Sequence, residues 1–588
     1  MSRVRLPVIY AGGDWAALLR GHLGPQAGDL SHDAVERTRR RLNLAIVIFI
    51  LVFAVLAARL AHLTTLNDNL VADRTNISQG KQKLRPIITD RNGVVLATQI
   101  YLTTLGVDTA QINKNETEKI DELVVRLKQI APTMNDKRAA KLMRGKSRYV
   151  VLAKGLKPAQ HQAILELGNP SLRLTREPHR VYPTGEVAAH ITGFSSSDMR
   201  GLAGLERTID RYSEYYGDMA NFVTSIDIRV QHVVRDELLQ GLKKFKARGA
   251  TSIIMDAHNG EVLAMVSLPD FDANRPANKS QAHFNYATLG VYELGSIFKI
   301  FTAAMALESG LIADDETFQT SKPLKFGRFT IADAHGQDRP LTLAEIVVHS
   351  SNIGSVQLAL RVPEAEHMAF LDKLGLTARL SDFELPETSW PLVPTRWTDI
   401  ERATTSFGHG ISVTPLHAVA AGAAMINGGV LYRPSLTKTP QPVGQRVISA
   451  ATSQKMRAMM RNVVLNGTGG KADVRGYGVL GKTGSGDKPQ AGAYSSTALV
   501  ASFVGAFPAD NPTYAVLVMY DEPQGIAETH NFALAGWNAA PTTAAIIRRA
   551  APLLGIMPQN NLEEKVAKTT TWLANYSETY EAEAYHAP

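Results

Sequence analysis

The chain has 588 residues, of which 45% are hydrophobic and 20% charged, and it contains no cysteine. This length exceeds what one hydrophobic core organises, so we expect at least two domains, and the composition excludes a largely disordered chain. The net charge of +8 comes without the dense basic stripe of a nucleic-acid-binding protein. The absence of cysteine excludes disulfides, thiolate metal sites and a cysteine nucleophile.

An apolar run near the N-terminus predicts a membrane anchor. Residues 44–58 are uninterrupted apolar sequence, and the segment 42–63 reaches the roughly 20 residues that a helix needs to cross a bilayer. Arginines cluster immediately before it, which predicts a cytoplasmic tail over residues 1–41 and everything after the span outside, in the periplasm. Because no A-x-A cleavage site follows, we expect a single-pass anchor in the cell inner membrane instead of a cleaved signal peptide.

Residues 64–222 predict a mixed α+β region that begins with a polar stalk. Residues 85–100 read as two extended segments around an Asp-Arg-Asn-Gly turn. Residues 117–168 have a helical, amphipathic pattern, and residues 177–194 are rich in turn signals. We interpret this region as a pedestal domain.

Residues 223–557 form a second region with a different pattern. β-Branched runs at 250–268 predict a hairpin around a His-Asn-Gly turn, and strand-like runs return at 498–507 and 513–521. Strands at both ends with helices between them predict an antiparallel sheet that brings the terminal strands together and is covered by helices. The remaining residues, 558–588, are acidic and lack a core pattern, which indicates a tail.

The sequence YELGSIFKIFTAAMALESG places a serine at the start of a helix. After Gly295 the apolar spacing is helical, so Ser296 lies at a helix N-terminus, where exposed N–H groups favour developing negative charge. Lys299 follows at i+3, on the same face. If burial lowers its pKa, this lysine can be the base for the serine hydroxyl. Ser-x-x-Lys is short and common by chance, and a capping serine with a solvated lysine also fits it.

Two later segments restrict the interpretation. In LAEIVVHSSNIGSVQLAL, Ser350 and Asn352 stand in a turn between two helical pieces, where they can relay a proton and bind a peptide group, or only cap the second helix. Lys482, Thr483 and Gly484 begin a glycine-rich strand or turn. A cation with a hydroxyl suits a substrate carboxylate, and the missing Cβ lets a substrate backbone approach. Ser-x-x-Lys, Ser-x-Asn and Lys-Thr-Gly in this order are typical of penicillin-binding proteins and serine β-lactamases.

A nucleotide-binding interpretation competes for the third motif. GYGVLGKT matches G-x-x-x-x-G-K-[ST], and residues 516–522 resemble the apolar strand and acid that hold magnesium. That loop delivers phosphates to a helix that begins at its lysine. Here GSGDKPQAGAYSS follows, and its glycines and proline oppose such a helix. The sequence therefore disfavours an ATPase.

The chain resembles the class B penicillin-binding proteins, most closely the division-specific peptidoglycan D,D-transpeptidases of the FtsI type. Besides the three motifs, the resemblance rests on RPIITDRNG, AAHITGF, GEVLAMVSLPDFDAN and FGHGISVTPLHAVAAGAAMINGG, and it extends from the anchor to about residue 555. It implies an α+β fold with a single transmembrane helix, a dimerisation-type pedestal domain, and a penicillin-recognising serine-transferase (β-lactamase-like) domain.

The resemblance also implies a serine acyl-enzyme. Ser296 would attack the carbonyl of the penultimate D-alanine of a stem peptide, Lys299 would accept its proton, and the terminal D-alanine would leave. Ser350 would pass a proton to the leaving amine. An amino group of a neighbouring stem would then attack the acyl-enzyme. β-Lactams would acylate the same serine.

The family's substrate contacts fall on the second and third motifs. Asn352 would bind the donor side chain, and Lys482 would polarise the site. Thr483 and Ser485 would meet the substrate carboxylate, with Gly484 between them. Backbone N–H groups of the nucleophile and of Ser485 would form the oxyanion hole.

Three positions depart from the family pattern. Leu294 stands where proline is usual, Ser485 where threonine is commoner, and Gly486 where a small side chain is usual. We expect the first to loosen the approach to the nucleophile and the last to add backbone freedom. None removes a catalytic group, so these changes bear on rate and β-lactam affinity.

Several alternatives share parts of this pattern. A bifunctional class A enzyme would need a glycosyltransferase domain, of which the region before the transpeptidase has no signature. A carboxypeptidase or β-lactamase uses the same nucleophile with water as acceptor, an elongation-specific class B enzyme does the same chemistry elsewhere, and an inactive scaffold would not need the motifs. The implied partners are stem peptides or a lipid-linked precursor, β-lactam antibiotics, a polytopic glycan polymerase and other division proteins. Neither cofactor nor metal is expected.

Overall fold

The computed structural model divides into two compact units, Met1–Lys83 and Leu84–Pro588. It describes residues 43–59, 85–113, 115–212, 221–276, 281–334, 336–438, 442–490 and 493–559. The predicted cytoplasmic tail, the stalk, and all but the first two residues of the predicted C-terminal tail lie outside the described residues.

Residues 43–59 form a helix whose apolar side chains, including Leu44, Phe49 and Phe53, are exposed. In the part of the chain that the structure describes, no helix combines the length and the apolar character needed to cross a membrane. The first residue and the last four residues of the expected span 42–63 lie outside the described residues. The anchor therefore stays a prediction.

The pedestal is built on a five-stranded sheet in the order β3-β2-β1-β5, with β4 also paired to β2. β1 and β5 run parallel, and the pairs that β2 makes with β1, β3 and β4 are antiparallel. The strands are β1 (Ile87–Thr89), β2 (Val95–Asp108), β3 (Tyr149–Leu156), β4 (Leu172–Val181) and β5 (Asn221–Val223). The expected turn at residues 90–93 is confirmed, since Asp90 accepts hydrogen bonds from the backbone of Asn92 and Val94.

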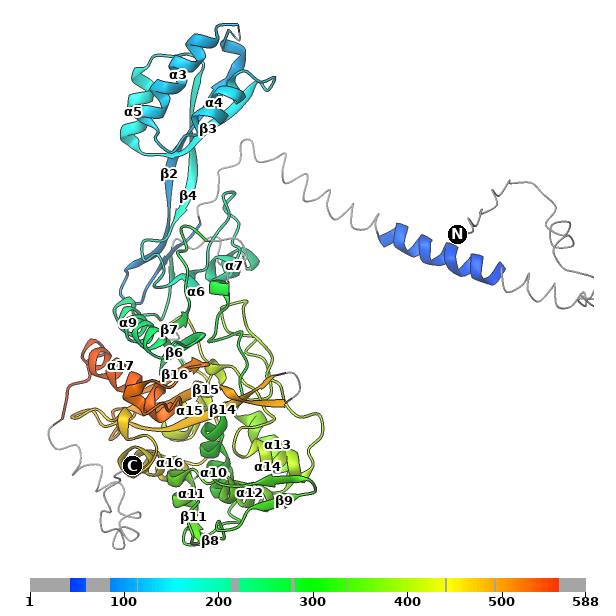
Figure 1. The fold of residues 1–588 in the computed structure, drawn as a ribbon, viewed down its shortest axis with the longest axis vertical. Helices are drawn as coiled ribbons and strands as arrows, with labels where there is room; N and C mark the ends of the chain where they lie inside the picture. The colour runs from blue at the N-terminus through cyan, green and yellow to red at the C-terminus, as the bar shows by residue number, and fades with distance from the viewer. Residues whose placement is uncertain are drawn as a thin grey trace, which may run out of the picture. The chain divides into compact units, whose positions relative to one another are not determined.

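Helices cover the outer end of this sheet, as Figure 1 shows for α3, α4 and α5 beside the long strands β2 and β4. Ile120, Leu127, Met143 and Ile164 bury their side chains against Leu105 and its neighbours. The helices of the pedestal are α3 (Thr117–Ile130), α4 (Asp136–Met143), α5 (Pro158–Glu166), α6 (Ala189–Thr192) and α7 (Gly204–Arg211), with a 3-10 turn, η2 (Thr109–Gln111).

Two expectations for the pedestal were wrong. Residues 149–156, expected to be helical, form β3, and residues 177–181, expected to be turns, are the end of β4. Both segments pair with β2, which is 14 residues long. Cross-strand hydrogen bonds and packing against a partner distant in sequence outweigh the weak local preference.

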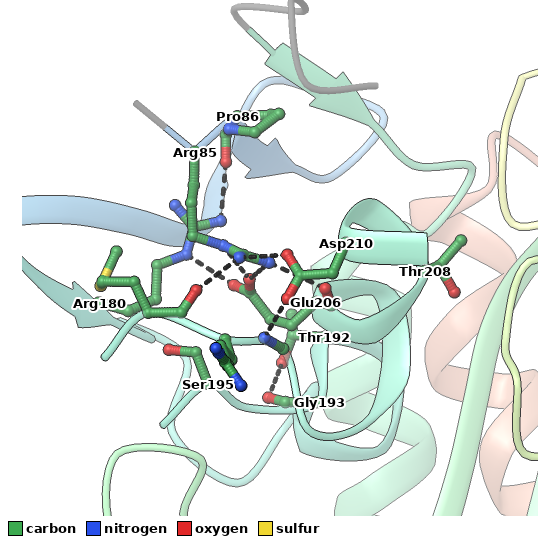
Figure 2. Close-up of polar contacts among 12 residues, drawn as sticks. Arg85, Pro86, Arg180, Thr192, Gly193, Ser195, Glu206, Thr208 and Asp210 are labelled. Atoms are coloured by element: carbon green, nitrogen blue, oxygen red, sulfur yellow. Dashed lines mark hydrogen bonds and ion pairs between the residues drawn. The ribbon is translucent and has the colours of Figure 1, made fainter. Parts of the chain in front are cut away.

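A buried ionic cluster connects Arg85, which precedes strand β1, to helix α7 (Figure 2). Glu206, which is fully buried, accepts from Arg180 Nε at 2.6 Å and from Arg85 Nε at 2.8 Å. Arg85 also pairs with Asp210. Such a cluster is costly to disrupt, because removal of one partner leaves another charge buried without compensation.

The second region, residues 223–557, contains the expected antiparallel sheet, in the order β14-β15-β16-β6-β7. β16 pairs with β6 from Tyr514 opposite Asp256 to Asp521 opposite Gly249, so the terminal strands come together as predicted. The hairpin β6–β7 is confirmed as well. The strands are β6 (Gly249–Asp256), β7 (Val262–Leu268), β14 (Leu480–Gln490), β15 (Ala493–Phe507) and β16 (Tyr514–Asp521).

Helices cover both faces of this sheet, as the side chains of β16 show, because they alternate between two hydrophobic cores. Val516 and Val518 face the core of α9 (Ile228–Lys244) and α17 (Ala539–Leu553), whereas Leu517 and Met519 face the larger core of the other helices. Those helices are α10 (Phe298–Glu308), α11 (Leu343–His349), α12 (Asn352–Arg361), α13 (Glu364–Lys373), α14 (Asp399–Thr405), α15 (Pro415–Ile426) and α16 (Ala450–Asn466).

Three two-stranded sheets and several 3-10 turns complete the described part of this region. The strand pairs are β8 (Thr317–Phe318) with β11 (Leu341–Thr342), β9 (Leu324–Phe326) with β10 (Phe329–Ile331), and β12 (Val430–Tyr432) with β13 (Gly444–Arg446). The 3-10 turns are η3 (Gln281–His283), η4 (Gly295–Ile297), η5 (Gly470–Ala472), η6 (Ala527–Thr529) and η7 (Ala535–Trp537).

Replacing Glu206 with Gln should lower the free energy of unfolding by about 3–5 kcal/mol, because the guanidinium of Arg180 then stays buried without a full counter-charge. Thermal or denaturant unfolding of the purified chain measures this. Asp198→Asn, which breaks an exposed pair with Arg200, is the control and should cost less than about 1 kcal/mol. Equal effects of the two substitutions would contradict this account of the cluster.

Candidate active site

The serine expected to be the nucleophile lies on a 3-10 turn that leads directly into a helix. η4 contains Ser296, and α10 starts two residues later, so the expected helix start is confirmed. Gly295 has φ +56°, a conformation that favours glycine, and a Cβ there would lie 2.4 Å from the carbonyl oxygen of Ser485. The turn is therefore pressed directly against strand β14.

Lys299 lies in the first turn of α10, and only 1% of its surface is exposed. Its Nζ donates to Ser350 Oγ at 3.1 Å and also to the Ser350 carbonyl oxygen. Burial lowers the pKa of Lys299 well below its ordinary value, the charge of Lys482 lowers it further, and the charge of Asp333 raises it. The direction of this shift is the one that a lysine base requires.

Ser350 occupies the turn between α11 and α12 and connects two lysines. Its Oγ accepts from Lys299 Nζ at 3.1 Å and from Lys482 Nζ at 3.0 Å. Its backbone is left-handed, with φ +60°. A non-glycine residue pays for this conformation with roughly 1–2 kcal/mol, so the surroundings of the turn must hold it.

The expected turn between two helices is confirmed, since α11 ends at His349 and α12 begins at Asn352. The structure also shows which residue caps α12. Ser351 Oγ accepts from the backbone N–H of Gly354 at 2.9 Å, so the capping role falls to Ser351. Asn352 Nδ2 donates to the Ala332 carbonyl at 2.9 Å. The hydroxyl of Ser350 thus remains directed at the two lysines.

The third motif lies on strand β14, at the edge of the sheet. Lys482 is fully buried, and burial lowers its pKa to about 7. Thr483 Oγ1 and Thr468 Oγ1 are 2.6 Å apart, and the backbone N–H of Ala535 donates to Ser485 Oγ at 3.1 Å. Residues 480–490 form a strand and not a helix, which removes the structural basis of the nucleotide-binding interpretation.

The glycines of β14 have a different role from the one expected. A Cβ at Gly484 would lie 2.2 Å from the carbonyl oxygen of Leu294, and one at Gly486 would lie 2.3 Å from that of Glu293. The space beside Gly484 is thus filled by the chain's own backbone and not by substrate. Leu294 is buried, and Gly486 lies against the backbone of Glu293. The expected effects of Leu294 and Gly486 on the approach to the nucleophile stay predictions.

Sequence reasoning missed two groups of this site. Asp333 accepts hydrogen bonds from the turn at Ser351, and Thr468 approaches the hydroxyl of Thr483. The glycines around Thr468 indicate a turn directly after a long helix, and that turn could have been considered as part of the site. Nothing in the local sequence distinguished Asp333 from other loop carboxylates. Among the residues that the structure describes, no group of three His, Asp or Glu side chains is placed to hold a metal ion.

The chemistry follows from two buried amines that share one hydroxyl. Two ammonium groups this close in a poorly solvated site repel each other, so one of them readily becomes neutral. A neutral amine can take the proton of a serine hydroxyl, and a helix N-terminus stabilises the negative charge that develops. An antiparallel sheet covered by helices, with a serine turn and this pair of lysines, defines a serine acyl-transfer enzyme.

The family models agree with this assignment. Residues 250–546 match the penicillin binding protein transpeptidase domain, and residues 82–214 match the penicillin-binding protein dimerisation domain. The chain belongs to the penicillin-binding protein transpeptidase family.

Relatives and solved structures cover most of the chain. The probable peptidoglycan D,D-transpeptidase FtsI of Caulobacter vibrioides is 38% identical over 82% of this chain and 84% of its own length. Peptidoglycan D,D-transpeptidase FtsI of Escherichia coli is 31% identical over 81% of this chain and 86% of its own. The crystal structure of penicillin binding protein 3 from Mycobacterium tuberculosis, complexed with aztreonam, superposes with a TM-score of 0.63 at 26% identity, covering 82% of this chain and 98% of that one.

Replacing Gly484 with Ala should destabilise the protein by about 1–3 kcal/mol, because the added Cβ would collide with a backbone carbonyl that cannot move freely. The midpoint of thermal unfolding measures the loss. Gly336→Ala is the control: a Cβ there meets nothing within 4 Å, so its stability should stay within about 0.5 kcal/mol of wild type. An unchanged midpoint in Gly484→Ala would show that β14 does not depend on this contact.

Proposed function

We propose that this protein is a penicillin-binding serine D,D-transpeptidase that cross-links peptidoglycan stem peptides during septal cell-wall synthesis. The observation that carries the proposal is the Ser350 hydroxyl held between the amines of Lys299 and Lys482, next to the turn that bears Ser296. The relatives named as peptidoglycan D,D-transpeptidases support the substrate class.

Ser296 is the nucleophile and Lys299 its base in this proposal. The serine oxygen bonds to the carbonyl carbon of the penultimate D-alanine, and its proton passes to Lys299. The C–N bond to the terminal D-alanine then breaks, and Ser350 passes the proton that Lys299 accepted to the leaving amine. An amine of a second stem peptide attacks the acyl-enzyme carbonyl, the ester C–O bond to Ser296 breaks as the cross-link forms, and a proton of the attacking amine returns to the serine through Lys299.

The substrate contacts are assigned to the second and third motifs. Asn352 binds the donor side chain, and Lys482 polarises the site through Ser350. Thr483 and Ser485 meet the carboxylate of the donor or of a β-lactam, with Gly484 holding the strand in place between them. Backbone N–H groups of the nucleophile and of Ser485 stabilise the oxyanion. The solved complexes of a relative with aztreonam and ampicillin support β-lactam binding at this site.

The chain organisation that we propose follows from the apolar segment and the two domain families. Residues 1–41 lie in the cytoplasm, residues 42–63 cross the inner membrane, and residues 64–222 form the pedestal. Residues 223–557 form the periplasmic transpeptidase domain, and residues 558–588 are a tail. This arrangement places the active site where cell wall is made, with the anchor and pedestal able to contact a glycan polymerase and other division proteins.

Ser296→Ala should abolish covalent labelling by a fluorescent penicillin, because the atom that forms the acyl bond is removed. Membranes that contain the full chain are labelled and separated on a denaturing gel, and stem-peptide substrate is tested for cross-linked product. Ser309→Ala, at the other end of α10, is the matched control and should label like wild type. An equally bright band from Ser296→Ala would refute the assignment of the nucleophile.

Lys482→Ala should move the acid limb of the acylation rate to higher pH. The charge of Lys482 lowers the pKa of Lys299, so without it Lys299 keeps its proton to a higher pH and is available as a base only above that point. The rate of acylation by a fluorescent penicillin, measured from about pH 5 to 9, reports the limb. A limb that moves to lower pH would contradict the coupling between the two lysines.

A further inference from the structure

The carboxylate of Asp333, which lies outside the three motifs, accepts hydrogen bonds from the turn that follows Ser350. Asp333 follows strand β10, and its Oδ2 accepts from Ser351 Oγ at 2.6 Å. Its Oδ1 accepts from the backbone N–H of Ile353 at 2.9 Å and from that of Asn352. The carboxylate thus bonds three consecutive residues.

The residue before Asp333 holds the same turn through its main chain. The carbonyl oxygen of Ala332 accepts from Asn352 Nδ2 at 2.9 Å. Two adjacent residues of one segment therefore contact both the backbone and the side chains of residues 351–353. Since helix α12 begins at Asn352, the carboxylate also meets the exposed N–H groups at a helix N-terminus, where negative charge is favoured.

These hydrogen bonds explain how the turn keeps an unfavourable backbone conformation. Ser350 has φ +60°, a left-handed conformation that is unfavourable for serine, and this conformation directs its hydroxyl and its carbonyl oxygen to the amine of Lys299. The hydroxyl of the next residue, Ser351, makes two hydrogen bonds: it donates to Asp333 and accepts from the N–H of Gly354. Because the residues after Ser350 are held in this way, the orientation of the Ser350 side chain is restricted.

We propose that Asp333 is a positioning residue for acyl transfer, which holds the turn at residues 350–353 so that the Ser350 hydroxyl stays between the two lysine amines. This inference rests on the proposed function. Asp333 bonds Ser351, Asn352 and Ile353, so it holds the turn that bears Ser350 and takes no part in bond making.

Asp333 also acts on the site through its charge, which supplies a readout that packing alone would not change. The groups that act on Lys299 by charge come from three directions: Lys482 on β14, Asp333 after β10, and His409 in the loop between α14 and α15, whose own pKa Lys299 helps to lower. Lys482 and burial lower the pKa of Lys299, and Asp333 opposes them. Removal of its charge therefore lowers the pKa of Lys299.

The test compares two substitutions that separate charge from geometry. Asp333→Asn removes the charge and nearly preserves the shape, whereas Asp333→Glu keeps the charge and displaces the oxygens. The full chain in detergent is acylated with a fluorescent penicillin, and the second-order rate is measured from about pH 5 to 9. We expect both variants to lose at least about tenfold in rate, the loss that corresponds to about 1.4 kcal/mol. Only Asp333→Asn should move the acid limb to lower pH.

Two further variants serve as a second probe and a control. Ser351→Ala removes the neutral partner of Asp333, so it should slow acylation and leave the acid limb in place. Asp121→Asn makes the same charge change in the pedestal, where Asp121 pairs with Arg144, and should match wild type in rate and profile. Asp333→Glu and Ser351→Ala keep the proposal testable if Asp333→Asn does not fold.

The outcomes distinguish this inference from the proposed function. A wild-type rate and pH profile in Asp333→Asn would overturn the positioning role, and so would a slower Asp333→Asn whose acid limb does not move, because that result assigns a purely structural cap. Labelling that persists in Ser296→Ala, or wild-type protein that does not label, would count against the proposed function instead.

Discussion

The burial of two lysine amines around one serine hydroxyl is the constraint on which the site depends. An ammonium group loses much hydration energy when it is removed from water, so the burial of Lys299 and Lys482 is the main cause of their lowered pKa values. Lys299 comes from α10, Lys482 from the edge strand β14, and Ser350 from the turn between α11 and α12. Three segments distant in sequence must therefore meet within hydrogen-bond distance, and the sheet and its covering helices provide the frame that holds them.

Close backbone contacts set the spacing between the serine turn and the edge strand. β14 lies so close to the turn at residues 293–297 that Gly484, Gly486 and Gly295 each leave no room for a side chain. Gly408 makes a similar approach from the loop after α14, since a Cβ there would lie 2.2 Å from the Gly295 carbonyl oxygen. Contacts between backbones are stiff, which suits a site whose serine must stay in register with two lysines.

The pedestal and the catalytic region share interactions that run through α7. On one side Glu206 binds Arg85 and Arg180, and on the other the N–H of Gly204 donates to the Glu387 carboxylate at 3.2 Å. The hydroxyl of Thr208 also donates to the Glu384 carbonyl oxygen. Helix α7 is thus held by residues of both domains. The charged side chains of Glu206, Arg85 and Arg180 are largely removed from water.

The sequence alone determined the elements whose signal is local. Helical spacing after Gly295 located α10 with its serine and lysine, and β-branched runs located the strands whose ends meet in the sheet, because such patterns record which face of an element is buried. Tertiary structure decided the rest. β3 and the end of β4 were misassigned because their strand form depends on β2, and the roles of Asp333, Thr468 and Gly484 depend on neighbours brought close only by folding. A hydrogen bond or a backbone contact between distant segments leaves no periodicity in either segment, so only the folded chain reveals it.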